Sequence, residues 1–250
     1  MIDIIITVIS IALSYYYTAF MHVFANPAPY KYIVVFIVSF LICWAALFIL
    51  FGIICVIISL PVNINKEYAK TSRFYTTLFG LMLEFAGFVS GARVIVNGRD
   101  KIPRKERFLF VSNHRSNYDP IIQCGEMKLQ PMAFISKRAN FRIPFIRRYM
   151  VRCRYIPLER KNMRNGAEAV MKAARMISSG QSCIGVYPEG TRNTGGNLLD
   201  FHNGCFKIAL WAKCPIVVSV IEERRISVRI FRSEEPRLSW ILLTLYHIIR

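Results

Sequence analysis

A run of 29 residues without a charged side chain, positions 32–60, limits the fold of this chain more than any other feature. It reads YIVVFIVSFLICWAALFILFGIICVIISL, and about 20 apolar residues are enough to cross the hydrocarbon core of a bilayer. We therefore expect a transmembrane helix here, long enough to span with some tilt. Residues 4–24 are nearly as apolar and predict a first hydrophobic helix. A signal peptide is the alternative for that segment, but its sequence has no basic leading region and no convincing small-residue cleavage site.

Charged residues are confined to the rest of the chain. The 250 residues include 33 Lys and Arg against 15 Asp and Glu, a formal charge of +18, yet 54% of them are apolar. Residues 1–65 contribute only Asp3 and Lys31, so the whole excess lies on residues 66–250, which suffice for one domain. Bases that follow the second apolar run, beginning with Lys66, place residue 61 onward in the cytoplasm by the positive-inside bias. The basic surface favours anionic membrane lipids as partners, whereas bases this scattered argue against a nucleic-acid binder.

The chain therefore divides into four parts. Two apolar helices occupy residues 1–30 and 31–61, a connecting region occupies 62–91, and a domain large enough to be catalytic occupies 92–250. Within the connecting region, the stretch 71–91 is apolar on most sides but carries Arg73 and Glu84. It predicts an interfacial helix, with a buried core helix as the alternative.

Strands and helices alternate from residue 92 onward. Apolar runs bounded by turn residues predict strands over 92–98, 108–112, 183–187, 215–221 and 225–232. Helical spacing predicts helices over 119–130, 166–180, 204–213 and, as a terminal apolar helix, 238–250. Such alternation is typical of an α/β fold, with a mixed, mostly parallel sheet flanked by helices and preceded by the N-terminal membrane helices.

Cysteine usage argues against a disulfide framework or a metal centre. The seven cysteines are odd in number, form no CxxC pair and mostly lie in apolar runs. A reducing compartment is the better interpretation, and we expect no metal site.

The first polar segment that could carry chemistry is NHRSNYD, residues 113–119, directly after a predicted strand. Ligands bind at the C-terminal ends of strands in α/β sheets, so His114 is well placed to act. Asp119, five residues on, can orient one ring nitrogen and leave the other free to take a proton from a hydroxyl. The alternative is that Asp119 only caps the following helix, with Pro120 at its first turn.

The second such segment is YPEGTRN, residues 187–193, which also follows a predicted strand. Gly190 lets backbone amides approach a ligand, and Arg192 can grip an anion with two hydrogen bonds. Turns of this composition are common, so the segment is informative only together with the first.

The two segments fit the NHxxxxD and [FY]PEGTR motifs, and the chain resembles the 1-acylglycerol-3-phosphate acyltransferases over about residues 75–221. Motif order and spacing agree with that family, and the segments FISKRANFRIPFI and RYIPLER between them are similar to further family blocks. The resemblance implies an enzyme of phospholipid biosynthesis in which His114 and Asp119 are catalytic. It also implies a set of substrate-binding residues: Asn113, Lys137, Arg160, Glu189, Gly190, Thr191 and Arg192.

The reaction implied by the resemblance is direct acyl transfer. His114 would deprotonate the free hydroxyl of lysophosphatidate, and that oxygen would attack the thioester of acyl-CoA or acyl carrier protein, giving phosphatidate without an acyl-enzyme or cofactor. The basic residues would hold the acceptor's phosphate, and Glu189 would hold its glycerol part or an arginine. Another lysolipid, such as lyso-ornithine lipid or lysocardiolipin, is an alternative acceptor. A lipase or thioesterase is the alternative from another class, although the sequence has no GxSxG motif.

Overall fold

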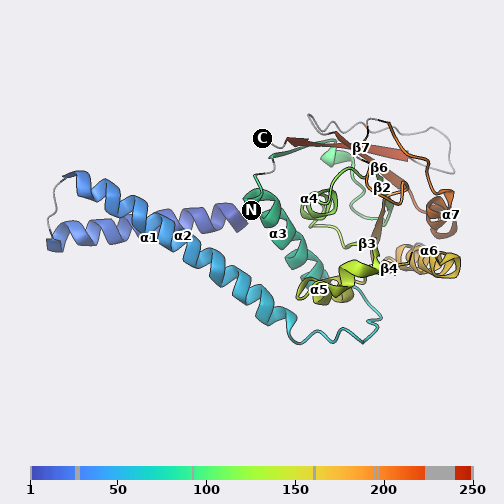
Figure 1. Ribbon diagram of the computed structural model, residues 1–250, viewed down its shortest axis with the longest axis horizontal. Helices are drawn as coiled ribbons and strands as arrows, with labels where there is room; N and C mark the ends of the chain where they lie inside the picture. Colours follow the sequence, from blue (N-terminus) through green and yellow to red (C-terminus); the bar gives the residue numbers. More distant parts are fainter. Residues whose placement is uncertain are drawn as a thin grey trace. The chain divides into compact units, whose positions relative to one another are not determined.

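The structure, a computed structural model, divides into two compact units, Met1–Pro61 and Val62–Arg250. Figure 1 shows the elements of both. The predicted strand over 225–232 and the candidate binding residue Arg160 lie outside the described residues, which are 2–25, 29–91, 93–159, 162–193, 195, 197–222 and 240–248.

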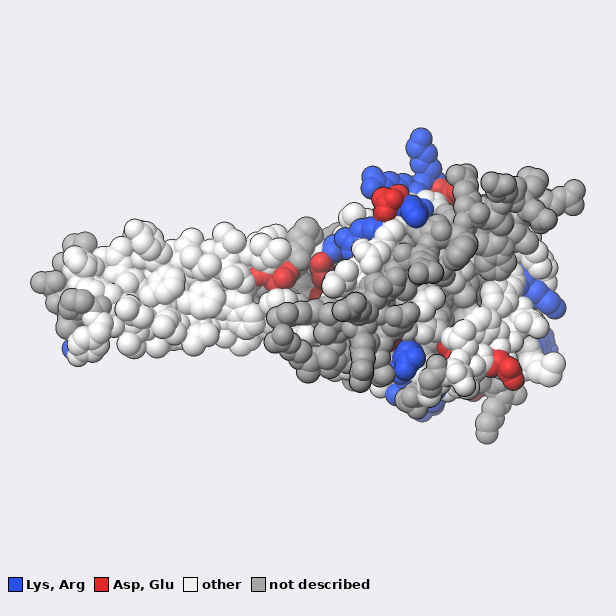
Figure 2. Space-filling view, turned by 90° about the horizontal axis from the view of Figure 1, so that it is seen from above, with Lys and Arg blue, Asp and Glu red and all other residues white. Residues whose placement is uncertain are grey.

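The first unit is a pair of helices, α1 (Ile2–Ala25) and α2 (Pro29–Ser59), packed on each other. By length and composition both can cross a membrane, and only 17% and 6% of their most apolar windows are buried. The fully buried Ser10 and Ser14 of α1 lie four residues apart, and small residues on one face let membrane helices approach closely. Figure 2 shows this helical part almost free of charged side chains. These helices indicate that the protein associates with a membrane.

The second unit contains a sheet in which the described strands follow the order β1-β7-β6-β2-β5-β3-β4. Neighbouring strands are parallel except for β1, which is antiparallel to β7. The predicted mixed, mostly parallel α/β fold is confirmed. The strands are β1 (Arg93–Asn97), β2 (Leu109–Ser112), β3 (Met132–Lys137), β4 (Ile156–Leu158), β5 (Cys183–Val186), β6 (Ile216–Glu222) and β7 (Trp240–Ile248).

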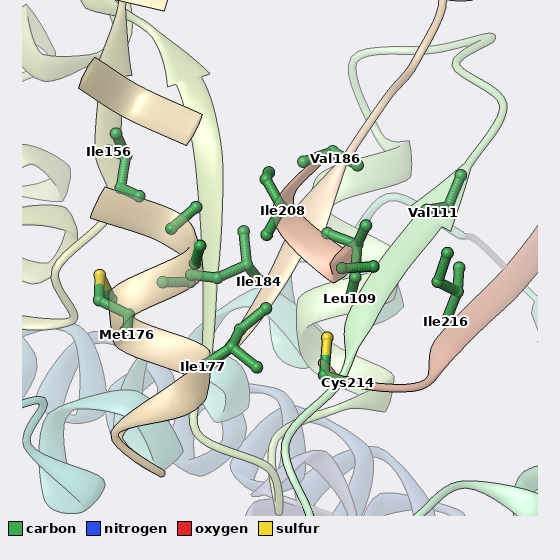
Figure 3. Close-up of a cluster of buried hydrophobic side chains, with 14 of the residues drawn as sticks. Leu109, Val111, Ile156, Met176, Ile177, Ile184, Val186, Ile208, Cys214 and Ile216 are labelled. Atoms are coloured by element: carbon green, nitrogen blue, oxygen red, sulfur yellow. The ribbon is translucent and has the colours of Figure 1, made fainter. Parts of the chain in front are cut away.

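Helices cover both faces of this sheet (Figure 1). On strand β2, Leu109 and Val111 pack with α6 and α7 in one apolar cluster (Figure 3), whereas Phe110 and the preceding Phe108 pack with α4 in another. This alternation is what a central strand buried on both faces requires. The helices of this unit are α3 (Arg73–Val89), α4 (Asp119–Glu126), α5 (Ile146–Arg152), α6 (Met163–Ser178) and α7 (Lys207–Ala212), with 3₁₀ turns η1 (Arg99–Lys101), η2 (Arg138–Arg142) and η3 (Asn203–Phe206).

Helix α3 belongs to the core of the second unit. It packs closely on α4, because a Cβ atom on Gly125 of α4 would lie only 2.8 Å from the Cα atom of Glu84. Glu84 of α3 is also paired with Lys128 at 2.6 Å, and the side chain of Phe79, on the same helix, is buried. The sequence left a core helix open as the alternative here, and this packing corresponds to it, although Phe74 at the start of α3 stays exposed.

The prediction of a helix over residues 238–250 is wrong. Residues 240–248 form strand β7, which pairs in parallel with β6 and antiparallel with β1. An apolar run of this length suits a buried strand as well as a helix, and its aromatic and β-branched residues suit a pleated surface. The pairing with β6 and β1 selects the strand. Strand β3 and helix α5 were not expected from the sequence at all.

Candidate active site

The two polar segments lie side by side because they follow neighbouring strands. Strands β2 and β5 are parallel, with Val111 opposite Val186, so their C-terminal ends meet at one edge of the sheet. The segment 113–119 leaves β2 there, and the segment 187–193 leaves β5 there. This is the edge at which α/β sheets bind ligands.

Asp119 holds the imidazole of His114. Its Oδ2 atom lies 2.9 Å from Nδ1 of His114 and accepts hydrogen bonds from the backbone amides of Arg115 at 2.6 Å and Ser116 at 2.7 Å. An ionised carboxylate can only accept, so in a neutral imidazole Nδ1 carries the proton and Nε2 keeps its lone pair. The predicted orienting role therefore has the geometry it needs.

Asp119 does not cap helix α4, which was the other interpretation of this residue. The N-cap position is Tyr118, and Asp119 is already the first helical residue. Its carboxylate points back at the preceding turn, where the two amides and the imidazole are its partners, and its side chain is 3% exposed. Burial with three donors is the environment that keeps a carboxylate in one place.

The second segment forms hydrogen bonds to both the backbone amide and the backbone carbonyl of His114. Glu189 accepts the His114 amide at Oε1, 3.0 Å away, and the Leu199 amide at Oε2, 3.2 Å away. The amide of Asn193 donates to the carbonyl of His114 at 2.7 Å. Glu189 is 3% exposed, and both of its carboxylate oxygens accept backbone amides, a role that the sequence did not predict.

The outer part of the second segment is open to solvent. Gly190 has φ of +65°, and a Cβ atom there would lie 2.7 Å from Cδ2 of His202, so any other residue would be strained here. Thr191 and Arg192 follow and are both exposed. The structure thus brings this turn next to His114 but leaves the guanidinium of Arg192 at the surface.

The side chain of Asn113 forms hydrogen bonds to the main chain of strand β6. Its side chain donates to the carbonyl of Ile221 at 2.9 Å and accepts from the amide of the same residue at 2.7 Å. These two bonds tie the turn after β2 to strand β6. Asn113 was expected to bind substrate, and it does not line the cavity described next.

An apolar cavity of about 780 Å³ opens beside His114. Tyr187, Gly190 and Lys137 also line it, the last of these with an exposed side chain. A cavity of this size and lining suits a hydrocarbon chain. Most of its wall is apolar, with contributions from α3, α4, β3, α5, β4 and α6: Leu83, Ile121, Ile135, Met150, Leu158 and Val170.

Sequence reasoning missed the aromatic and amide neighbours of His114. The rings of His114 and Tyr187 stack with centroids 4.2 Å apart and planes 21° apart. The Tyr187 hydroxyl donates to Oε1 of Gln123 at 2.6 Å, and Nε2 of Gln123 donates to Oγ of Ser112 at 2.7 Å. One signal was available: Gln123 follows Asp119 by four residues, which puts both on one face of the predicted helix.

Among the described residues, no cluster of three or more His, Cys, Asp or Glu side chains could hold a metal ion.

Comparison with known proteins places the chain in a family. The sequence model of the Acyltransferase family matches residues 93–222, more than half of the chain, so the chain belongs to that family. A solved structure, the 1-acyl-sn-glycerophosphate (LPA) acyltransferase PlsC from Thermotoga maritima, matches with a TM-score of 0.51 over 98% of this chain and 85% of the other. Sequence identity to it is 20%, so this likeness concerns the fold.

Curated relatives share a name. A 1-acyl-sn-glycerol-3-phosphate acyltransferase of Borreliella burgdorferi is 34% identical over 123 residues, which are 49% of this chain and 48% of the relative. The protein of that name from Haemophilus influenzae is 28% identical over 71% and 69% of the two chains. The human alpha enzyme is 30% identical over 56% and 50%. The match thus spans about half the length of the bacterial protein cited first and of the human enzyme.

Proposed function

We propose that this protein is a membrane-associated O-acyltransferase that converts 1-acylglycerol-3-phosphate to phosphatidate. The acyl donor is a thioester, acyl-CoA or acyl carrier protein. The observation that carries the proposal is the pair of half-buried His114 and buried Asp119, with Nδ1 and Oδ2 2.9 Å apart, beside an apolar cavity of about 780 Å³. Membership of the Acyltransferase family and the names of the relatives support the same reaction.

The mechanism we propose uses His114 as a general base. Nε2 takes the proton from the free hydroxyl of the acceptor while that oxygen attacks the thioester carbonyl. The tetrahedral intermediate then expels the thiolate, which takes the proton from the imidazolium, so that an ester and a free thiol leave. A positioned base contributes roughly 10²–10⁴ in rate, and alignment of the two substrates contributes more.

A covalent acyl-enzyme is a poorer account of the same site. Cys124 lines the cavity, but burial raises the pKa of its thiol to about 12, so it stays protonated at neutral pH. Ser112 is buried and its hydroxyl is already bonded, as donor to the Asn113 carbonyl at 3.1 Å and as acceptor from Gln123. Neither side chain has the activated geometry that a nucleophile needs. Direct attack by the acceptor hydroxyl needs neither of them.

The acceptor's phosphate is assigned to Arg192, with Lys137 and Arg160 as further candidates. Arg192 stands at the exposed end of the turn whose other residues hold His114, so a phosphate bound there would leave the glycerol hydroxyl within reach of the imidazole. A guanidinium suits phosphate because it donates two parallel hydrogen bonds. Gly190 and Thr191, in the same turn, would offer backbone amides.

The catalytic unit is assigned to the cytoplasmic side of the membrane. Lys66, Lys70 and Arg73 follow α2, and cytoplasmic flanks of membrane helices carry such bases. In a cysteine-free variant, a cysteine introduced as Tyr30→Cys should react with an impermeant reagent from outside the cell, and Arg164→Cys should not. The reverse pattern would contradict the assignment. Labelling at neither position would favour a hairpin that enters one leaflet only.

The decisive assay supplies the purified protein with lysophosphatidate and acyl-CoA and follows the lipid products. Phosphatidate with equimolar free CoA supports the proposed transferase, and free fatty acid alone would mean a hydrolase. Parallel reactions with acyl carrier protein as donor, and with lyso-ornithine lipid or lysocardiolipin as acceptor, decide the substrate pair. A preference of more than about tenfold for another lysolipid, which is about 1.4 kcal/mol, would overturn the acceptor assignment.

A further inference from the structure

Helix α4 offers two polar side chains to the site, one helical turn apart. Asp119 and Gln123 are separated by four residues and both are buried, with 2% and 0% of their surfaces exposed. Residues at this spacing lie on the same face of a helix. Asp119 contacts the imidazole of His114, and Gln123 contacts the phenol of Tyr187.

The two rings held by α4 are stacked on each other. Their centroids are 4.2 Å apart and their planes are 21° apart, so Tyr187 covers one face of the imidazole. Gln123 is itself fixed, because its amide nitrogen donates to Oγ of Ser112, which is 1% exposed at the end of β2. Strand β2 therefore holds Gln123, Gln123 holds Tyr187, and Tyr187 lies against His114.

The other neighbour of the Tyr187 ring is fixed by a glycine. Phe134 of β3 lies with its ring centroid 5.9 Å from that of Tyr187, at 25° between planes. A Cβ atom on Gly185 would lie 2.3 Å from Cε1 of Phe134, so the ring occupies space that only glycine leaves free. The position of Tyr187 is thus set by packing as well as by its hydroxyl.

We propose that Gln123 is a positioning residue for the catalytic histidine, acting through Tyr187. This inference rests on the proposed general-base role of His114. The bond from Asp119 to Nδ1 fixes one edge of the imidazole, but the ring can still tilt about that bond. Tyr187, held in place by Gln123, blocks the tilt and keeps Nε2 directed at the acceptor hydroxyl. Its electron-rich face also stabilises the imidazolium that forms when the proton is taken.

This arrangement predicts a loss in kcat and not in substrate binding. Gln123→Met keeps the volume of the side chain and removes the bond to the Tyr187 hydroxyl. Tyr187→Phe keeps the ring and breaks the same bond from the other end, so it tests the link even where the methionine variant folds poorly. Each should lower kcat about tenfold, with KM for lysophosphatidate and acyl-CoA within about twofold of wild type.

The double variant separates positioning from stability. If Gln123 acts only through Tyr187, adding Gln123→Met to Tyr187→Phe lowers kcat by less than about twofold. A matched control is Gln130→Met. Gln130 is half-buried and bonded to the Pro103 carbonyl at 3.2 Å and to Arg107 at 3.4 Å, away from the rings. The Gln130→Met variant should leave kcat unchanged. Unchanged kcat in Gln123→Met, equal losses in both backgrounds, or a change confined to KM would each overturn the inference.

A nuclear magnetic resonance measurement tests the positioning of His114 independently of activity. In detergent-solubilised protein, the ring current of Tyr187 should move the imidazole proton resonances of His114 upfield, and the His114→Ala variant identifies those resonances. Gln123→Met and Tyr187→Phe should both shift them, whereas Gln130→Met should not. A wild-type protein without transferase activity would overturn the proposed function and leave this test standing. If the His114 imidazole resonances are unchanged in both variants, the positioning role of Gln123 is overturned even in an active enzyme.

Discussion

The two turns that form the site differ in how completely the protein itself holds them. In the turn after β2, the side chain, amide and carbonyl of His114 all have partners, in Asp119, Glu189 and Asn193. In the turn after β5, Glu189 is buried but Thr191 and Arg192 are exposed. In the mechanism proposed above, the proton-transfer geometry is then built before the substrate arrives, whereas the phosphate side is completed by the substrate.

Removal of the base should have the largest effect. We expect His114→Ala to lower kcat about 10²- to 10⁴-fold, because the substitution removes Nε2, the proposed acceptor of the hydroxyl proton. Turnover is measured as phosphatidate formed from lysophosphatidate and acyl-CoA. Membrane retention and the thermal midpoint serve as controls and should match wild type. Near-normal turnover in this variant would remove the basis for assigning the site.

The open turn should respond through substrate binding. Arg192→Lys keeps the charge but loses the planar fork, so we expect KM for lysophosphatidate to rise about 10- to 150-fold, the equivalent of about 1.5–3 kcal/mol, while KM for acyl-CoA changes little. Arg104→Lys, at an exposed arginine in the loop leading into β2, is the matched control and should change neither constant. Similar behaviour of the two variants would place Arg192 among ordinary surface charges.

The closed turn allows charge to be separated from geometry. In Asp119→Asn the amide oxygen can take the place of Oδ2 and accept from the amides of Arg115 and Ser116 and from His114. What is lost is the negative charge that favours the imidazolium, so we expect kcat to fall about tenfold with KM unchanged. Steady-state kinetics test this. Asp119→Ala removes the acceptor as well and should be as inactive as His114→Ala; equal activity of the Asn and Ala variants would contradict the distinction.

Glu189, which joins the two turns, should matter most for stability. In Glu189→Gln only one carboxamide oxygen remains for two backbone amides, those of His114 and Leu199. One buried donor loses its acceptor, which costs about 1–3 kcal/mol of unfolding free energy. Thermal unfolding in detergent measures the loss. Glu168→Gln, at an exposed glutamate paired with Arg164 at 3.2 Å, is the control and should cost less than about 0.5 kcal/mol. Equal losses would mean that Glu189 does not clamp the turns.

Much of the fold followed from local patterns. The apolar runs at 4–24 and 32–60 correspond to α1 and α2, and the apolar segments at 108–112 and 183–187 correspond to β2 and β5. Because both polar motifs follow strands, their meeting at one sheet edge was also predictable. The C-terminal run was misjudged because its residues suit a helix or a strand equally, and only the pairing with β6 and β1 selects the strand.

For this protein, the sequence alone determined which segments are apolar enough for a membrane, that strands and helices alternate, and which side chains lie where strands end. Those properties depend on neighbours a few residues apart. Tertiary structure decided the roles within the site: Asp119 serves the turn and not the helix end, Glu189 bonds to the main chain of His114, 75 residues away in sequence, and Tyr187 reaches Gln123, 64 residues away. A hydrogen bond needs atoms within about 3 Å, and between distant residues only the packed sheet and helices set that distance.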